Sequence, residues 1–311
     1  MQPSRFTLDS FSLEQVIDRR PLTVSPDMFL VDVISLMSQT RCISNSLVDQ
    51  AAICDFYSRG RTSCALVTEG SQLLGILTER DIVKLAASQQ TLEGIWVEKL
   101  MTSKVITLPI HKFKNIYTAL SLLRQHHIRH LPVVHKNDQL LGLITFSTLR
   151  HALQPSKLLQ FWQVADVMTT QLVHAPPSTS LLQLSQLMTH HSVSCVVITE
   201  DNPQAKIQTL NPSHCPPSTP HPMPQTPIGI VTERDIVQFK ALGFDFQELQ
   251  AQAVMSTPLF LMQPEDALWD AHQKMQQRRL RRLVVADKQG NLRGVITQSS
   301  LLKILNSITL D

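Results

Sequence analysis

The sequence has few glycines, few aromatic residues and no long apolar run, and each shortage narrows what the chain can do. Nine glycines in 311 residues leave no glycine-rich loop that could cradle a phosphate. Aromatic residues make up only 5% of the chain, which disfavours a nucleic-acid surface. No window approaches the roughly 18 apolar residues of a membrane-spanning helix. We therefore expect no phosphate loop and no membrane partner.

The cysteines and the net charge predict neither a disulfide framework nor nucleic-acid binding. The five cysteines are odd in number and have no regular spacing, which is typical of reduced thiols in a cytosolic protein. The first residues lack the basic-then-apolar pattern of a signal peptide, so we expect a cytoplasmic location. Lysine and arginine exceed acidic residues by only 28 to 25, too little to predict nucleic-acid binding.

Catalytic and metal-binding patterns are also missing. Histidines cluster at 126–130 and at 190–191 without a strong zinc spacing, so we expect no metal site. No Ser/His/Asp or Cys/His arrangement stands out, and we predict no catalytic residue and no enzyme activity.

What the sequence does contain is a repeat. The hexapeptide Thr-Glu-Arg-Asp-Ile-Val occurs at 78–83 and again 154 residues later at 232–237, each time shortly after a glycine, Gly75 or Gly229. Weaker relatives of the same motif begin at Gly142 and Gly294, which are 152 residues apart. A fixed-period repeat indicates a duplication, and the order here is A-B-A′-B′: four units in two similar halves.

Each unit is predicted to have the same α/β (α+β) order of strand, helix, strand, strand and helix. Unit two shows it most clearly: a strand at 105–108, a helix at 115–126 with one apolar face, a hairpin around 136–139 and a closing helix at 147–153. The predicted repeats cover 12–88, 95–155, 162–243 and 248–308.

Units one and three carry insertions. In unit one, residues 41–61 separate the helix from the next strand. In unit three, residues 201–227 hold eight prolines, which cannot join a helix or a central strand. We predict a disordered or polyproline-like excursion from a hairpin tip, with docking as a proline-rich ligand as the alternative.

The four units resemble cystathionine-β-synthase (CBS) domains. The resemblance covers nearly the whole chain and is carried by Met-Thr openings such as Met101-Thr102, by the strand Arg-His-Leu-Pro-Val-Val at 129–134, and by the Gly-φ-φ-Thr-x-x-Asp motif, where φ is apolar. It implies that units pair through their sheets into two modules, often called Bateman modules. It also implies binding of adenosine compounds such as AMP, ADP, ATP or S-adenosylmethionine, with no further cofactor, and regulation of an effector.

The resemblance assigns ligand roles to the strong motif copies. Asp81 and Asp235 would accept hydrogen bonds from the ribose hydroxyls, because an ionised carboxylate is an acceptor only. Thr78 and Thr232 would reach phosphate, and Gly75 and Gly229 would allow close approach of the backbone.

A purely local role for the same motif remains open, because Thr-x-x-Asp at the start of a helix is also a capping box. The contrast among units favours the site. Units two and four place Thr148 and Ser300 where the aspartate would be, and a generic cap needs no such difference.

Phosphate binding also needs cations. The resemblance implies that basic residues before the Leu-Pro-Val-Val strand face the cleft, and two pairs match: Arg129 with His130, and Arg281 with Arg282. The alternative is that these side chains point into solvent. The arginine-rich run at 278–282 could also be a nucleic-acid patch, but it lies at a helix-to-strand junction rather than on an extended basic face.

Three hypotheses follow. The first is a regulatory sensor of an adenosine-containing small molecule, with an effector that is a separate protein or an attached domain. The second is a scaffold whose ligand-free repeats serve interaction or dimerisation, since two chains could pair symmetrically. The third is an enzyme, which the motif inventory disfavours.

Overall fold

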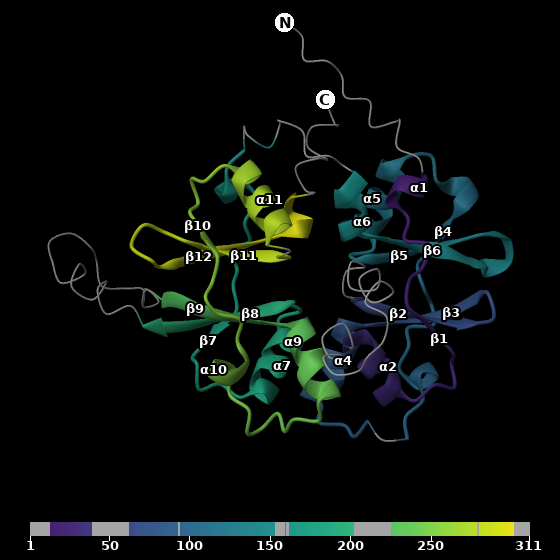
Figure 1. Ribbon diagram of the computed structural model, residues 1–311, viewed down its shortest axis with the longest axis horizontal. Helices are drawn as coiled ribbons and strands as arrows, with labels where there is room; N and C mark the ends of the chain where they lie inside the picture. Colours follow the sequence, from purple (N-terminus) through teal and green to yellow (C-terminus); the bar gives the residue numbers. More distant parts are fainter. Residues whose placement is uncertain are drawn as a thin grey trace, which may run out of the picture. The chain divides into compact units, whose positions relative to one another are not determined.

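The computed structural model describes residues 13–38, 62–92, 94–152, 159, 162–201, 225–278 and 280–301. The predicted insertion at 41–61 and the central part of the proline-rich segment, 202–224, lie outside these residues. The chain divides into two compact units, which are described separately (Figure 1). The first comprises Met1–Gln154 with Arg234–Phe244, and the second comprises Pro155–Glu233 with Asp245–Asp311.

Each repeat forms one three-stranded mixed sheet, in which the second strand pairs parallel with the first and antiparallel with the third. This confirms the predicted α/β fold. The elements of repeats one and two are α1 (Leu13–Val16), β1 (Thr23–Val24), α2 (Leu30–Ser38), β2 (Cys64–Glu69), β3 (Gln72–Thr78), α4 (Glu79–Ala87), η3 (Val97–Lys99), β4 (Leu108–Pro109), η4 (Ile110–Lys112), α5 (Ile116–Gln125), β5 (His130–Val134), η5 (Lys136–Asp138), β6 (Leu140–Thr145) and α6 (Phe146–Ala152).

Repeats three and four follow the same order. Their elements are η7 (Val164–Asp166), β7 (His174–Ala175), α7 (Leu181–His190), β8 (Cys195–Asp201), β9 (Gln225–Thr232), α9 (Glu233–Ala241), α10 (Ala251–Val254), β10 (Leu261–Met262), α11 (Leu268–Gln277), β11 (Arg282–Ala286) and β12 (Leu292–Thr297). Helical backbone begins again at residue 298, as predicted for the last closing helix.

Helix α5 shows how the apolar spacing produces these elements. Four apolar side chains spaced three or four residues apart are buried on one face, and Asn115 caps the helix by accepting a hydrogen bond from the Thr118 amide at 3.3 Å. The buried side chains are Ile116, Ala119, Leu120 and Leu123. The helix predicted at 115–126 is therefore confirmed to within its caps.

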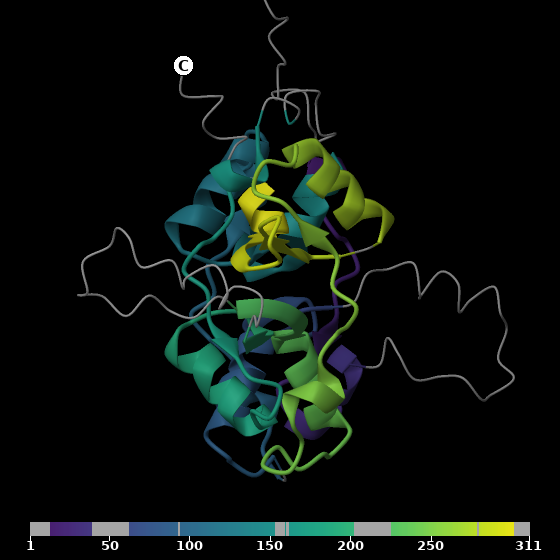
Figure 2. The ribbon, with the colours of Figure 1, turned by 90° about the vertical axis from the view of Figure 1, so that its left-hand side faces the viewer.

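Within each unit the two sheets face one another and the helices cover their outer faces, as Figures 1 and 2 show. Alternate side chains of β2 point to opposite faces of its sheet. Cys64 and Leu66 pack against Val134 and Leu143 of the other sheet, whereas Ala65 and Val67 belong to the cluster that includes the helices. The second unit repeats this contact, with Val197 packed against Val284 and Val295.

The segment that opens each repeat crosses to the other repeat of its unit. Asp18 bridges Leu143 of β6, and Thr102 bridges Ile76 of β3. In the second unit Thr169 bridges Val295 and Ser256 bridges Ile230. Each repeat thus supplies a residue that pairs with the edge strand of its neighbour.

Two predictions about strands are corrected. Of the strand predicted at 105–108, only Leu108 belongs to β4, which also includes Pro109, because just these two residues pair with β5. The excursion predicted at 201–227 is shorter, since Asp201 ends β8 and Gln225 begins β9. Pro227 lies inside β9, where it is tolerated because β9 is an edge strand of its sheet.

The turn between β11 and β12 is organised by one carboxylate. Asp287 accepts hydrogen bonds from the Gln289 and Asn291 amides at 3.0 and 2.8 Å, and Arg293 Nε donates to it at 2.9 Å. Burial alone would raise the pKa of Asp287. The hydrogen bonds from Asn291 and Arg293 outweigh burial, so this pKa lies below its ordinary value.

Candidate functional site

Asp81 lies at the third position of α4 and is held by the residue that begins the helix. Its Oδ2 atom accepts hydrogen bonds from the Thr78 amide at 2.9 Å and from the Thr78 hydroxyl at 2.6 Å. The local capping role is therefore realised in this helix. The side chain is half-buried, and none of the described residues donates a hydrogen bond to its other oxygen, Oδ1.

Repeats two and four make the same cap without a carboxylate. The Thr145 amide donates to the Thr148 hydroxyl at 2.9 Å, and the Thr297 amide donates to the Ser300 hydroxyl at 3.3 Å. A hydroxyl is therefore sufficient to satisfy the backbone at this turn. The aspartate of repeat one supplies something that capping does not require: a negative charge and a second acceptor oxygen.

His130 links the second repeat to this turn. Its Nε2 lies 2.6 Å from the Ser63 hydroxyl, and the Ser63 carbonyl accepts a hydrogen bond from the Glu79 amide at 3.1 Å, at the first position of α4. The next residue, Cys64, pairs with Thr78 across the sheet. The structure thus brings His130 of repeat two to the Thr78–Asp81 turn of repeat one.

The two members of each basic pair are neighbours in the chain and occupy different positions relative to the strand. His130 lies on the same face of β5 as Val134, which packs against the other sheet, so His130 faces repeat one. Arg129 precedes the strand and is half-buried. In repeat four, Arg282 shares the face of Val284, and Arg281 precedes the strand. Each pair therefore places one residue on the inward face of its strand and the other at the start of the strand.

In the second unit, Arg282 lies within electrostatic reach of Cys195 of repeat three. Burial raises the pKa of the Cys195 thiol, and the positive charge of Arg282 opposes part of that rise. Thr232 ends β9 opposite Cys195, as Thr78 ends β3 opposite Cys64. Asp235, which the division of the chain assigns to the first unit, is half-buried at the third position of α9.

A methionine side chain packs against each of the two motif glycines. A Cβ added at Gly75 would meet Sδ of Met101, and one added at Gly229 would meet Sδ of Met255. Both methionines belong to the crossing segments, so this packing by itself favours a small residue at Gly75 and Gly229. Close approach of the protein backbone to a ligand at Gly75 and Gly229 stays a prediction.

Two residues at this turn were not singled out from the sequence. The sequence gives no signal for Ser63, because its contact with His130 depends on the packing of strands that are distant in the chain. Glu79 is 6% exposed and forms an ion pair with Arg234 at 3.3 Å within the first unit. The sequence could have suggested this ion pair, because the repeated hexapeptide contains a glutamate and an arginine.

The structure also describes part of the arginine-rich run and bears on the metal and membrane expectations. Arg278 of the arginine-rich run lies over the Phe260 ring, 5.2 Å from its centre. Among the described residues, no group of three or more His, Cys, Asp or Glu side chains is arranged to hold a metal ion. The helices of the described part are all too short or too polar to cross a membrane.

Comparison with known proteins agrees with the four-repeat architecture. The family model for the CBS domain matches residues 13–88, 97–155, 164–205 and 251–307, more than half of the chain. The third match ends at the proline-rich segment. The fold is similar to a solved structure from Methanocaldococcus jannaschii, which has been proposed as an archaeal homolog of γ-AMPK. The two structures superpose with a TM-score of 0.70 at 16% sequence identity, and the match covers 94% of this chain and 98% of that one.

Curated relatives match smaller parts. An uncharacterised protein of M. jannaschii is 29% identical over 127 residues, which are 40% of this chain and 30% of that protein. The CBS domain-containing protein YhcV of Bacillus subtilis is 31% identical over 139 residues, 44% of this chain and 81% of that protein. The chain spans between 30% and 61% of the length of the first three curated relatives it matches.

Proposed function

The chain belongs to the CBS domain family, and we propose that it is a regulatory protein that senses an adenosine nucleotide. The proposed site in the first unit lies between repeats one and two, at the turn where β3 passes into α4. The observation that carries the proposal is the Asp81 carboxylate. Among the described residues it caps α4 through Oδ2 and leaves Oδ1 without a donor, at a turn that a hydroxyl also caps in repeats two and four.

Each side chain has a role that suits its chemistry. Oδ1 of Asp81 would accept a hydrogen bond from a ribose hydroxyl. The Thr78 hydroxyl and His130 would face the phosphates, with Arg129 beside them as the second cation. In the second half, Asp235, Thr232, Arg281 and Arg282 occupy the corresponding sequence positions and are proposed to act in the same way.

Regulation requires that the nucleotide bind two states of the protein with different affinity. The ligand would join the aspartate-bearing repeat to the cation-bearing repeat, and an effector protein or attached domain would respond to that change. We propose a cytoplasmic location, a non-enzymatic role and no resident cofactor. The alternative is a ligand-free scaffold, and the complete Thr78–Asp81 cap is the observation that favours it.

The test is thermal unfolding of the full chain with AMP, ADP, ATP or S-adenosylmethionine. A ligand that binds only the folded state raises the midpoint by mass action. The informative variant is Asp81→Thr, because it keeps the hydroxyl cap of repeat two and removes the charge and the spare oxygen. Thr148→Ala is the matched control, since it weakens the same cap in repeat two without touching the proposed site.

We expect one of the ligands to raise the midpoint of the wild type and of Thr148→Ala, and to lose about tenfold or more in affinity in Asp81→Thr, as expected for a charged hydrogen-bond partner. Asp235→Thr tests the second half in the same way. If no ligand stabilises the wild type freed of bound nucleotide, or if Asp81→Thr is stabilised equally, the scaffold is the better description.

A further inference from the structure

The charges of the chain are unevenly distributed, and the second repeat is strongly basic. Residues 99–137 contain seven lysines and arginines and no aspartate or glutamate, although the whole chain is nearly balanced. Lys104, Lys112, Lys114 and Arg124 are all exposed. In the part of the chain that the structure describes, none of these four forms an ion pair. A positive surface of this kind attracts an anionic partner.

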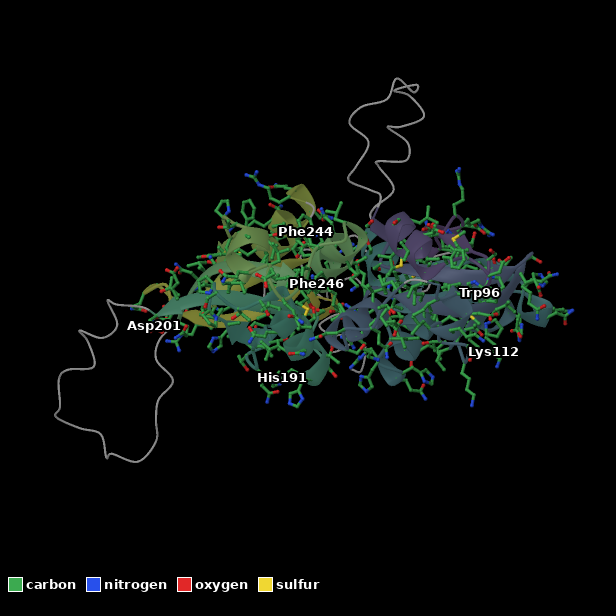
Figure 3. All side chains as sticks on the ribbon, turned by 90° about the horizontal axis from the view of Figure 1, so that it is seen from below. Trp96, Lys112, His191, Asp201, Phe244 and Phe246 are labelled. Carbon is green, nitrogen blue, oxygen red and sulfur yellow. The ribbon has the colours of Figure 1, made fainter. Side chains whose placement is uncertain are left out.

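A cavity of about 340 Å³ opens on the same repeat, between β4 and α5. Its apolar lining comes from Leu108, Pro109 and Leu122. Its polar lining comes from the hydroxyls of Thr107, Thr118 and Ser121 and from the exposed ammonium group of Lys112, which is labelled in Figure 3. Strand β4 is an edge of its sheet, so the groove follows an edge that no further strand covers among the described residues.

The other three repeats show that the fold does not need this basic rim. Eight positions separate Leu108 from Ile116, the first residue of α5. Six separate the equivalent residues in each other repeat: Val24 and Leu30, Ala175 and Leu181, and Met262 and Leu268. The longer connection carries His111, Lys112 and Lys114, whereas the shorter ones contain no lysine or arginine.

We propose that the groove between β4 and α5 binds an acidic segment of a partner protein. An aliphatic side chain of that segment would fill the apolar lining, and its carboxylates would meet Lys112, Lys114 and the hydroxyl groups. A protein segment fits better than nucleic acid, because single-stranded nucleic acid is held by exposed aromatic rings. Trp96, at 46% exposure, is the exposed aromatic side chain among the described residues of repeat two, and it is not among the residues that line the groove, none of which is aromatic. The proposal does not depend on the nucleotide site, with which it shares no residue.

The test selects binders from a displayed library of random peptides about twelve residues long, a length that suits an extended segment in a groove. The full chain is the target. We expect the selected peptides to combine acidic with aliphatic residues. A labelled synthetic copy should bind in fluorescence anisotropy and lose about tenfold or more in affinity in the double variant Lys112→Glu/Lys114→Glu, with a steep dependence on salt.

Two matched controls separate charge from shape. Lys288→Glu reverses an exposed charge on the β11–β12 turn and should leave peptide binding unchanged. Ser121→Phe fills the groove without changing charge and should weaken binding, whereas Gln273→Phe, at the equivalent exposed position of α11, should not. Thermal unfolding of every variant confirms that it is folded.

Four outcomes would overturn the proposal. The selected peptides could lack acidic residues, or they could bind Lys112→Glu/Lys114→Glu as tightly as the wild type. A single-stranded oligonucleotide could bind in a Lys112-dependent manner where no acidic peptide does, which would assign the surface to nucleic acid. Inorganic phosphate could displace the peptide at concentrations that salt alone does not explain, which would assign the groove to a small anion.

Discussion

At the scale of single residues, the crossing segments make some glycines far less replaceable than others. A Cβ added at Gly142 would lie 2.5 Å from the backbone carbonyl oxygen of Asp18, which cannot move without the crossing segment. A Cβ added at Gly75 would instead meet the flexible side chain of Met101, which can adopt another rotamer.

We therefore expect Gly142→Ala to lower the free energy of unfolding by about 1–3 kcal/mol and Gly75→Ala to lower it by less. Urea unfolding of the two variants measures the difference. Adding Met101→Ala to Gly75→Ala should recover part of the loss, because it removes the atoms that the new methyl group meets. Equal stability of Gly142→Ala and the wild type would contradict the geometry of the crossing.

At the scale of elements, the β11–β12 turn depends on the ionised form of Asp287. Its folded pKa lies below the unfolded value of about 3.9, so the folded state favours the charged carboxylate. The stabilisation is present above about pH 4 and is lost as the pH falls through the lowered folded pKa. At 14% side-chain exposure the group is shielded from most solvent screening.

We expect Asp287→Asn to cost about 1–3 kcal/mol near pH 7 and to cost less at acid pH, as the wild-type carboxyl becomes protonated. Urea unfolding across that range checks the trend. Asp245→Asn is the control, because Asp245 is exposed and holds the Gln247 amide, so its effect should be small at every pH. A constant difference between Asp287→Asn and the wild type would show that charge is not the cause.

The elements also show which parts of the fold a sequence can predict. Helix α5 was predicted almost to the residue, because its apolar spacing and its Asn115 cap are local properties. The extent of β4 was not, because the strand exists only where Leu108 and Pro109 reach β5. Pro227 was excluded from strands by a rule for central strands, and its position at a sheet edge depends on topology.

The candidate site divides in the same way. The repeated motif was enough to single out Thr78 and Asp81, and the resemblance to CBS domains added their ligand roles and His130. The contact between His130 and Ser63 joins residues 67 positions apart and depends on the packing of two sheets. The sequence also left capping and ligand binding as alternatives for Asp81. In the part of the chain that the structure describes, one carboxylate oxygen makes the cap and the other accepts no hydrogen bond.

At the scale of the whole molecule, the first unit should hold together even when its chain is cut between the repeats. Asp18 and Thr102 each complete the sheet of the other repeat, and the two sheets share an apolar interface. Gln90 and Thr91, in the connection between the repeats, are exposed.

We expect a protease recognition sequence inserted between Gln90 and Thr91 to be cleaved without separating the fragments in gel filtration under native conditions. They should separate in denaturant, where the sheets unfold. Cleavage of the same sequence appended to the amino terminus is the control for nonspecific damage. Fragments that separate under native conditions would mean that the crossing segments contribute little.

The exchanged opening segments have a consequence for how such a chain could have arisen. A gene for one repeat would encode a polypeptide whose first residues and whose glycine-bearing strand both lack a partner. Two copies of that polypeptide could satisfy each other by trading those segments. An ancestor of this kind would exist as a self-associated pair, and fusing two copies of its gene would preserve every contact. Later recombination could then move whole pairs, because a single repeat excised from one would carry away part of its neighbour's sheet.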